Sequence, residues 1–293
     1  MLSDVLAIVE AEGWFDSTLP FEKTIYLSQG SSQCVLLSRN GKADTFVKFT
    51  DLASLATEAM RCGQGAERFP EHAPRFVGYA KRPPLEVLVT RAVSFRPLAS
   101  RMMLAARDRA AVHDGLERFF QRMREGLPGA GDAQPGHAWF VDMCAYYDGH
   151  GLGARAGTGL QLLRATLETL PPLPQHGDLV LNNLGLRPDR GLVIFDWEDY
   201  AAINLPGLDL FTLENSIHQD LELQSLQRRS KVSPEALDSG RMCEALGLKP
   251  ALYTDLRLSY ALAFRYLKRN YNQEVRTRIE RVIDIQLAGR GIA

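Results

Sequence analysis

The chain has 293 residues, of which 45% are hydrophobic and 24% are charged. This composition is typical of a folded globular protein, and it excludes a collagen-like, rod-like or wholly disordered chain. Because 34 basic residues nearly balance 35 acidic ones, no overall field attracts nucleic acid or an anionic membrane. The length predicts about two domains, or one large bilobed one.

Targeting and redox signals are scarce. Acidic residues at positions 4, 10 and 12 interrupt the first fifteen residues, so no secretory signal is expected there. No apolar run approaches the roughly 18 residues that span a bilayer. None of the four cysteines belongs to a C-x-x-C pair, which argues against a zinc site or a disulfide framework. We expect a cytoplasmic protein with no membrane or nucleic-acid partner; no signal indicates its oligomeric state.

The first ninety residues predict a helix followed by short strands. A helix is expected over Ser3–Glu12, with Ser3 as its N-cap. Asn40-Gly41 is a strong hairpin signal, because both residues tolerate positive φ. The other expected elements are strands at 24–27, 34–38, 45–49, 74–79 and 85–91 and a helix at 52–68.

After Arg91 the pattern becomes helical. Helices are expected at 104–125, at 160–170 and within 234–286, most clearly at 253–271, and the glycine- and proline-rich stretch 126–136 is expected to be a loop. The predicted architecture is α+β. A small antiparallel-sheet N-lobe, residues 1–91, is followed by a larger, mainly helical C-lobe, residues 92–293.

Polar residues that suit phosphate chemistry lie on both sides of a predicted hairpin. A Pro-Asp-x-Gly turn joins two apolar runs, and a turn centred between Asp189 and Arg190 places Asn183 opposite Asp196. Directly opposed side chains have Cβ atoms about 5 Å apart, so an amide oxygen and a carboxylate would meet there. Two such oxygens suit Mg²⁺. Asp178, just upstream, has the character of a general base for phosphoryl transfer.

A simpler interpretation is a solvated loop followed by an ordinary hairpin. That interpretation is adequate for any one of these polar residues alone. It is less adequate for the three together, because a carboxylate directly after the buried run Val193–Phe195 must find a partner.

Two strings in this region resemble a known family. HGDLVLNN at 176–183 and VIFDWED at 193–199 look like the catalytic loop and the metal-binding segment of the aminoglycoside phosphotransferase and choline kinase family. Gly207-Leu208-Asp209-Leu210 is similar to a Gly-x-Asp-Leu element that follows them in that family. The resemblance implies a bilobal, protein-kinase-like fold. It also implies a catalytic base at Asp178, Mg²⁺ ligands at Asn183 and Asp196, and structural roles for His176 and Asp209.

The N-terminal half contains residues that a kinase-like lobe requires. Lys48, inside the apolar strand 45–49, would hold the α- and β-phosphates of the nucleotide. Its expected partner is Glu58 on the next helix, with Glu67 as the fallback. The resemblance places the phosphate loop at Gly30, Ser31 and Ser32, and the adenine beside the backbone of Thr90 to Ala92.

The sequence departs from the family pattern within the catalytic loop. Val180-Leu181-Asn182 stand where the family commonly has His-Pro-Gly, and the phosphate loop has a single glycine. No proposed ligand is lost. These departures keep open a second class of function, a catalytically weak nucleotide-binding pseudokinase or scaffold.

The predicted activity is an ATP- or GTP- and Mg²⁺-dependent phosphotransferase. Its acceptor would be a hydroxyl of a small molecule, such as an aminoglycoside, an amino alcohol or a sugar-like compound. Carboxylates beside an aromatic ring suit a cationic acceptor. The candidate acceptor-binding residues are Trp197, Glu198 and Glu214, although acidic residues on helices are more often simply solvated.

Overall fold

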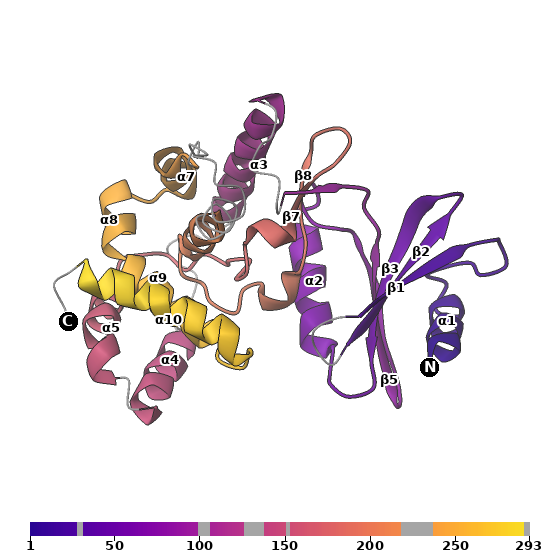
Figure 1. Ribbon diagram of the computed structural model, residues 1–293, viewed down its shortest axis with the longest axis horizontal. Coiled ribbons are helices and arrows are strands. Elements are labelled where there is room, and N and C mark those ends of the chain that lie inside the picture. Colours follow the sequence, from indigo (N-terminus) through magenta and orange to yellow (C-terminus); the bar gives the residue numbers. More distant parts are fainter. Residues whose placement is uncertain (28–31, 99–105, 126–137, 151–152, 218–236, 290–293) are drawn as a thin grey trace, which may run out of the picture. The chain divides into compact units, whose positions relative to one another are not determined.

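The computed structural model describes most of the chain (Figure 1). The described residues are 1–27, 32–98, 106–125, 138–150, 153–217 and 237–289. They form two compact units, which are discontinuous in sequence. The first comprises Met1–Leu98 and Asn183–Glu198, and the second Ala99–Asn182 and Asp199–Ala293. The division predicted after Arg91 differs from this, because the structure groups the hairpin segment 183–198 with the first unit.

The first unit is built on a five-stranded antiparallel sheet with the strand order β1-β2-β3-β5-β4. All five strands and both helices predicted for residues 1–91 are present. They are α1 (Leu2–Ala11), β1 (Glu22–Leu27), β2 (Gln33–Arg39), β3 (Lys42–Thr50), α2 (Ala56–Arg68), β4 (Phe76–Arg82) and β5 (Leu85–Arg91). Asn40 and Gly41, with φ of 51° and 69°, form the predicted hairpin turn between β2 and β3.

Two helix starts differ from the prediction. Helix α1 has Met1 as its N-cap, without a side-chain cap, so Ser3 lies inside the helix. Helix α2 begins at Ala56 rather than at residue 52. The carboxylate of Glu86 accepts hydrogen bonds from the Leu55 N–H (2.6 Å) and the Ser54 hydroxyl (3.1 Å). These bonds hold the preceding residues in a turn, outside the helix.

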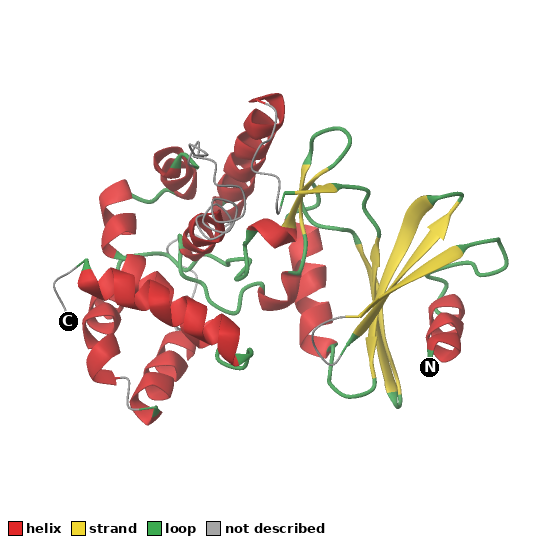
Figure 2. Cartoon of the chain, viewed as in Figure 1, coloured by secondary structure: helices red, strands yellow, loops and turns green. Residues whose placement is uncertain are grey.

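The two faces of the sheet have different roles because side chains alternate along each strand. Val47 and Phe49 of β3 are buried in a core with Val5 and Val9 of α1. The intervening Lys48 belongs to the opposite face, on the side of α2. Figures 1 and 2 show α1 and α2 on opposite sides of the sheet. One face is therefore a hydrophobic core, and the other is available to build a site.

A small three-stranded sheet with the order β6-β7-β8 completes the first unit. Its strands are β6 (Arg96–Pro97), β7 (Leu184–Leu186) and β8 (Leu192–Ile194). Strand β8 is tied to the rest of the unit by a hydrogen bond. The Ile194 N–H donates to the carbonyl of His72 at 2.7 Å.

The predicted hairpin exists, but its predicted register is wrong by one residue. Leu184 pairs with Ile194, so the position opposite Asn183 is that of Phe195 rather than Asp196. The turn has three residues, closed by a hydrogen bond from Arg187 N–H to Gly191 O. Arg190 occupies the left-handed region with φ of 67°. Such a three-residue turn, with a left-handed third position, adds one residue to the two-residue loop that the prediction assumed.

The second unit is built from helices (Figure 2). They are α3 (Ala106–Arg124), α4 (Ala138–Gly149), α5 (Gly153–Leu167), residues 208–217, α7 (Ser239–Leu246), α8 (Pro250–Asp255), α9 (Arg257–Leu267) and α10 (Gln273–Ala288). The helices predicted at 104–125 and 160–170 correspond to α3 and α5. The helix predicted at 253–271 is interrupted at Leu256, and α4 was not predicted because its hydrophobic residues do not follow one face. The predicted loop 126–136 lies outside the described residues.

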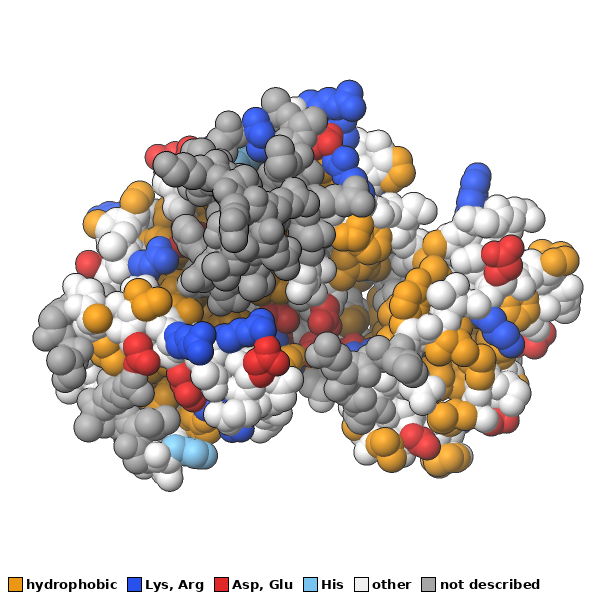
Figure 3. Space-filling view, viewed as in Figure 1, with side chains coloured by type: hydrophobic (Ala, Val, Ile, Leu, Met, Phe, Trp, Pro, Cys, Tyr) orange, Lys and Arg blue, Asp and Glu red, His pale blue; other side chains and the backbone are white. Residues whose placement is uncertain are grey.

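The face of the molecule in Figure 3 carries side chains of both charge signs, and hydrophobic side chains gather over part of the sheet-containing unit. In the described part of the chain, no helix has the length and apolar character needed to cross a membrane. All four cysteines are free thiols. The absence of disulfide bonds among them agrees with their scattered positions in the sequence.

The acid stability of the first unit should depend on Glu86. A hydrogen bond from Lys81 is the main factor that lowers the pKa of Glu86, and bonds from Leu55 and Tyr79 help to bring it to about 2 against the opposing effect of burial. The unfolded pKa is near 4.5. The stabilising contribution of Glu86 is therefore complete above about pH 4.5 and is lost as the pH falls toward 2.

The measurement is the free energy of unfolding in urea between pH 7 and pH 2.5. We expect Glu86→Gln to lower it by about 1–3 kcal/mol at pH 7 and to flatten its decline in acid. Glu10→Gln, at an exposed position of α1, is the control and should follow the parent curve. Parent and Glu86→Gln curves of identical shape would show that Glu86 does not control acid stability.

Candidate active site

An ion pair joins the central strand of the sheet to helix α2. Lys48 Nζ lies 2.7 Å and 2.8 Å from the two carboxylate oxygens of Glu58, and both side chains are largely buried. Burial alone would lower the pKa of Lys48, but the charge of Glu58 and its hydrogen bonds, with the charges of Glu198 and Asp196, raise it above its ordinary value. The ammonium therefore stays charged. Glu67, the fallback partner, is exposed.

The face of the sheet that carries Lys48 lines a cavity of about 530 Å³. The alternation of side chains explains its composition, because the residues that share this face lie at every second position of their strands. These residues are Cys34, Leu36, Phe46, Lys48, Leu88 and Thr90. Phe95 and Phe195, whose ring centroids are 4.3 Å apart, also line the cavity. The lining is mainly apolar, and Lys48, Glu58 and Asp196 make its most polar part.

The structure describes only some of the residues predicted to bind the nucleotide through their backbone. Thr90 and Ala92 line the cavity. However, the N–H of Ala92 donates to the carbonyl of Asp44 at 3.0 Å, so this group is engaged within the protein. Of the predicted phosphate loop, Gly30 and Ser31 lie outside the described residues, and Ser32 directly precedes β2.

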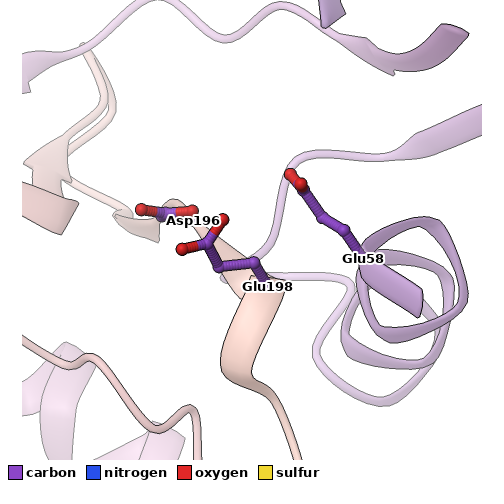
Figure 4. Close-up of side chains that lie close together, drawn as sticks. All are labelled: Glu58, Asp196 and Glu198. Carbon is purple, nitrogen blue, oxygen red and sulfur yellow. The ribbon is translucent and has the colours of Figure 1, made fainter. Parts of the chain in front are cut away.

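Three carboxylates lie close together in the first unit (Figure 4), and two of them contact Lys48. Glu58 comes from α2, and Asp196 and Glu198 come from the segment after β8; one oxygen of each lies within 4.8 Å of the others. Asp196 has a left-handed backbone with φ of 61°, which turns the chain directly after β8. Arg61 of α2 donates to the carbonyl of Glu198 at 2.6 Å and so ties this segment to the helix.

Glu198, predicted as a candidate for acceptor binding, lies beside Lys48. Its Oε2 is 3.5 Å from Lys48 Nζ, so its described contact is with the lysine predicted to hold phosphates, and its role in acceptor binding stays a prediction. The sequence held one signal for this contact, the separation of only two residues between Glu198 and Asp196. Asn183 ends a short 3-10 helix, Leu181–Asn183, and its carbonyl accepts from the Phe195 N–H at 2.8 Å. Its predicted role as a ligand stays a prediction.

Trp197, predicted as a candidate acceptor-binding residue, is a core residue. It is 3% exposed, stacks on Phe69 with ring centroids 5.4 Å apart, and donates from Nε1 to the Ile194 carbonyl. Its ring packs directly on Gly65 of α2. We therefore do not assign acceptor binding to Trp197, because these contacts engage its ring and its N–H.

In the second unit, a buried aspartate braces the predicted catalytic loop. Asp209 accepts hydrogen bonds from the backbone N–H groups of His176 (2.6 Å) and Gly177 (2.8 Å). Gly177 has φ of 88°, a conformation that favours glycine. Burial raises the pKa of Asp209 to about 7, against the lowering effect of the two N–H donors. The helix formed by residues 208–217 thus holds the backbone that precedes Asp178.

Asp178 has a partner that was not predicted from the sequence. Its Oδ2 lies 3.2 Å from Nζ of Lys268, which also contacts Asp199 Oδ2 at 2.7 Å. The Asp178 N–H donates to Nδ1 of His176 at 3.3 Å. Lys268 follows α9 beside other basic residues, a pattern typical of any helix C-terminus, so no sequence signal singled it out.

Glu214, the third predicted acceptor residue, is buried and satisfied. Its carboxylate accepts from the Tyr253 hydroxyl and from Arg257, both at 2.8 Å, and from the Ser239 hydroxyl. These contacts join the helix 208–217 to α7, α8 and α9. We therefore describe Glu214 as a structural residue of the second unit.

Comparison with known proteins identifies the family. A sequence model of the phosphotransferase enzyme family matches residues 28–240, and the chain belongs to this family. No curated protein matches the chain in a sequence search.

Solved structures of aminoglycoside phosphotransferases share the fold. APH(3'')-Id from Streptomyces rimosus is 16% identical, with a TM-score of 0.57 over 91% of this chain and 98% of that one. A thermostable mutant of APH(4)-Ia is 14% identical, with a TM-score of 0.61 over 96% and 97%. A ternary complex of APH(2'')-IIa with streptomycin and ATP is 11% identical, with a TM-score of 0.60 over 98% and 96%. The chain thus has the kinase-like α+β fold that the sequence predicted.

The contact between Gly65 and Trp197 can be tested with a matched pair of substitutions on α2. A β-carbon at Gly65 would overlap the indole ring, whereas one at Gly63 would meet Phe76 at 3.6 Å, an ordinary contact. We expect Gly65→Ala to lower the free energy of unfolding by about 1–3 kcal/mol because the ring must move. Gly63→Ala should raise it by up to about 1 kcal/mol, since alanine favours a helix. Equal effects in chemical denaturation would contradict the packing described.

Proposed function

We propose that this chain is an ATP- or GTP-dependent, Mg²⁺-requiring phosphotransferase that moves the γ-phosphoryl group to a hydroxyl of a small molecule. The observation that carries the proposal is Lys48, held by both oxygens of Glu58 in the polar part of a mainly apolar cavity. A cavity of this size with a few convergent polar groups suits a nucleotide. Membership of the phosphotransferase family supports the reaction class.

The nucleotide would place its base against the apolar part of the cavity and its phosphates near Lys48. Since the Ala92 N–H is engaged with Asp44, the base would hydrogen-bond to other backbone groups of residues 90–93. Ser32 and its neighbours Gly30 and Ser31 are the proposed phosphate loop. Structures of family relatives bound to ADP or ATP support nucleotide binding.

The carboxylates beside Lys48 fit a divalent cation. Asp196 is exposed and supplies hard oxygen atoms, and Glu198 lies within reach of it, whereas both oxygens of Glu58 are engaged by Lys48. We propose Asp196 and Asn183 as the Mg²⁺ ligands, with Glu198 as a further candidate. The ion would neutralise charge on the phosphates.

The proposed reaction needs positioning rather than a covalent intermediate. The acceptor oxygen forms a bond to the γ-phosphorus as the bond from this phosphorus to the bridging oxygen breaks, and the nucleoside diphosphate leaves. The hydroxyl proton passes to the carboxylate of Asp178. Lys48 holds the remaining phosphates, so the contribution of the protein is geometry and electrostatics.

The acceptor class follows from the family and not from the residues first considered. Trp197 and Glu214 are occupied by structural contacts, and Glu198 lies beside Lys48. Aminoglycosides, amino alcohols and sugar-like alcohols are the proposed acceptors. Relatives in complex with streptomycin or hygromycin B support including aminoglycosides in a test.

A screen of these acceptors with ATP and GTP in the presence of Mg²⁺ tests the proposal. The readout is phosphorylated acceptor, detected by mass spectrometry, together with nucleoside diphosphate. We expect transfer by the parent chain and a fall in turnover of at least about 100-fold in Asp178→Asn, because a positioned general base contributes about that much. Nucleotide binding, measured by calorimetry, should survive.

The control for this variant is Asp142→Asn, at an exposed position of α4, which should leave turnover unchanged. Near-parental turnover in Asp178→Asn would remove Asp178 as the base. Nucleotide binding by the parent chain without transfer to any acceptor in the panel would favour the second class, a nucleotide-binding pseudokinase or scaffold.

The role of Asp196 predicts a change in the metal dependence of nucleotide binding. Asp196→Ala should lower the Mg²⁺-dependent gain in nucleotide affinity by about tenfold or more, since it removes a ligand oxygen. Calorimetric titrations with and without Mg²⁺ measure this gain. Glu67→Ala, at an exposed position of α2, is the control. An undiminished Mg²⁺ effect in Asp196→Ala would mean that other residues hold the ion.

A further inference from the structure

A buried lysine lies between two aspartates in the second unit. Lys268 is only 2% exposed, and its Nζ contacts Asp199 Oδ2 at 2.7 Å and Asp178 Oδ2 at 3.2 Å. It also donates to the hydroxyl of Tyr271 at 3.2 Å. Lysine is almost never this buried without a paired charge, so the position of Lys268 depends on these carboxylates.

The charge of Lys268 is maintained by its partners. Burial would lower the pKa of Lys268, but the negative charges of Asp178 and Asp199 raise it above its ordinary value. The group is therefore an ammonium that faces two carboxylates. Removal of this ammonium would leave two negative charges close together in a place with little access to water, an arrangement of high energy.

Asp178 is thus held from several directions. Asp209 fixes the backbone of His176 and Gly177 immediately before it. Gly177 packs so closely on Asp199 that a β-carbon there would lie 2.8 Å from the Asp199 carbonyl oxygen. Unlike these backbone contacts, the ion pair with Lys268 acts on the Asp178 carboxylate itself. The backbone contacts place the loop, and the ammonium orients the reacting group.

We propose that Lys268 is a positioning residue for the general base, with Asp199 as the second anchor of its ammonium. This inference rests on the proposed function, in which the Asp178 carboxylate receives the acceptor proton. The ion pair uses Oδ2 of Asp178, and it fixes the direction of the carboxylate and balances its charge until the proton arrives. Displacement of a reacting group by about 1 Å can cost about 100-fold in rate.

The test compares Lys268→Met with Lys268→Arg in steady-state phosphotransfer. Lys268→Met should lower kcat about 100-fold while the KM for the nucleotide changes less than about twofold, since the Lys48 site is a separate set of residues. Lys268→Arg keeps the positive charge and should recover most of the loss. Lys249→Met, an exposed lysine of the same unit, is the control and should match the parent.

A chemical rescue separates positioning from a purely structural role. In Lys268→Ala, ethylammonium added to the solution should enter the space left by the side chain and raise kcat at least about tenfold, toward the parental value. The same salt should have no effect on the parent or on Lys249→Met. Parental kcat in Lys268→Met, or a loss that neither arginine nor ethylammonium relieves, would overturn the proposal.

A stability measurement tests the ion pair independently of activity. Asp178→Asn should lower Tm in the parent, where it breaks the contact with Lys268, and raise Tm in Lys268→Met, where it removes one of the two negative charges that the ammonium no longer balances. Additive effects would overturn the proposal even if the chain is an active kinase. A different result would contradict the proposed function instead: the parent transfers no phosphate, but Asp178→Asn still changes Tm in opposite directions in the parent and in Lys268→Met.

One variant in this design carries a risk of misfolding. Lys268→Met leaves two carboxylates without their ammonium, and this destabilises the chain. The comparison is then made in an Asp199→Asn background, which removes one of the two carboxylates that Lys268 balances. Lys268→Met should again lower kcat there, and an unchanged kcat would overturn the proposal.

Discussion

The ion pair between Lys48 and Glu58 is the interaction on which the proposed nucleotide site depends. An antiparallel sheet places side chains alternately on its two faces, and on β3 this alternation puts a lysine among apolar side chains. A charge in that position must have a partner, and α2 supplies Glu58 at 2.7 Å. The same ammonium lies 3.5 Å from Glu198. One lysine thereby connects the sheet, the helix and the segment that follows β8. Its positive charge lies in an otherwise mainly apolar cavity, where we propose that it binds phosphates.

In the second unit, buried negative charges also have partners. Asp209 is completely buried and accepts two backbone N–H groups, and Asp178 and Asp199 share the ammonium of Lys268. In each case a buried or partly buried charge fixes the geometry of a neighbouring segment, because an unpaired charge there would be costly. The loop that holds the proposed base is therefore ordered by electrostatics as much as by packing.

The chain passes between the two units at Leu98–Ala99, at Asn182–Asn183 and at Glu198–Asp199. The last two crossings fall inside the strings that resemble the catalytic loop and the metal-binding segment. Asp178 therefore belongs to one unit, whereas Asn183 and Asp196 belong to the other. A short stretch of sequence thus contributes the proposed base to one unit and the proposed metal ligands to the other. The base contacts Lys268, whereas Asp196 lies near Glu58 and Glu198.

The order of elements in the first ninety residues was predictable from the sequence, because alternation and turn residues are local properties of a chain. The kinase-like fold and the pairing of Lys48 with Glu58 were implied by the resemblance to the family. The register of the β7–β8 hairpin was not predictable, since the choice between a two- and a three-residue turn depended on the left-handed backbone of Arg190. The core position of Trp197, the proximity of Glu198 to Lys48 and the contact of Lys268 with Asp178 also emerged only from the tertiary structure. These contacts join residues up to 150 positions apart, and a charged or aromatic residue carries no local sign of the distant partner that packing will bring to it.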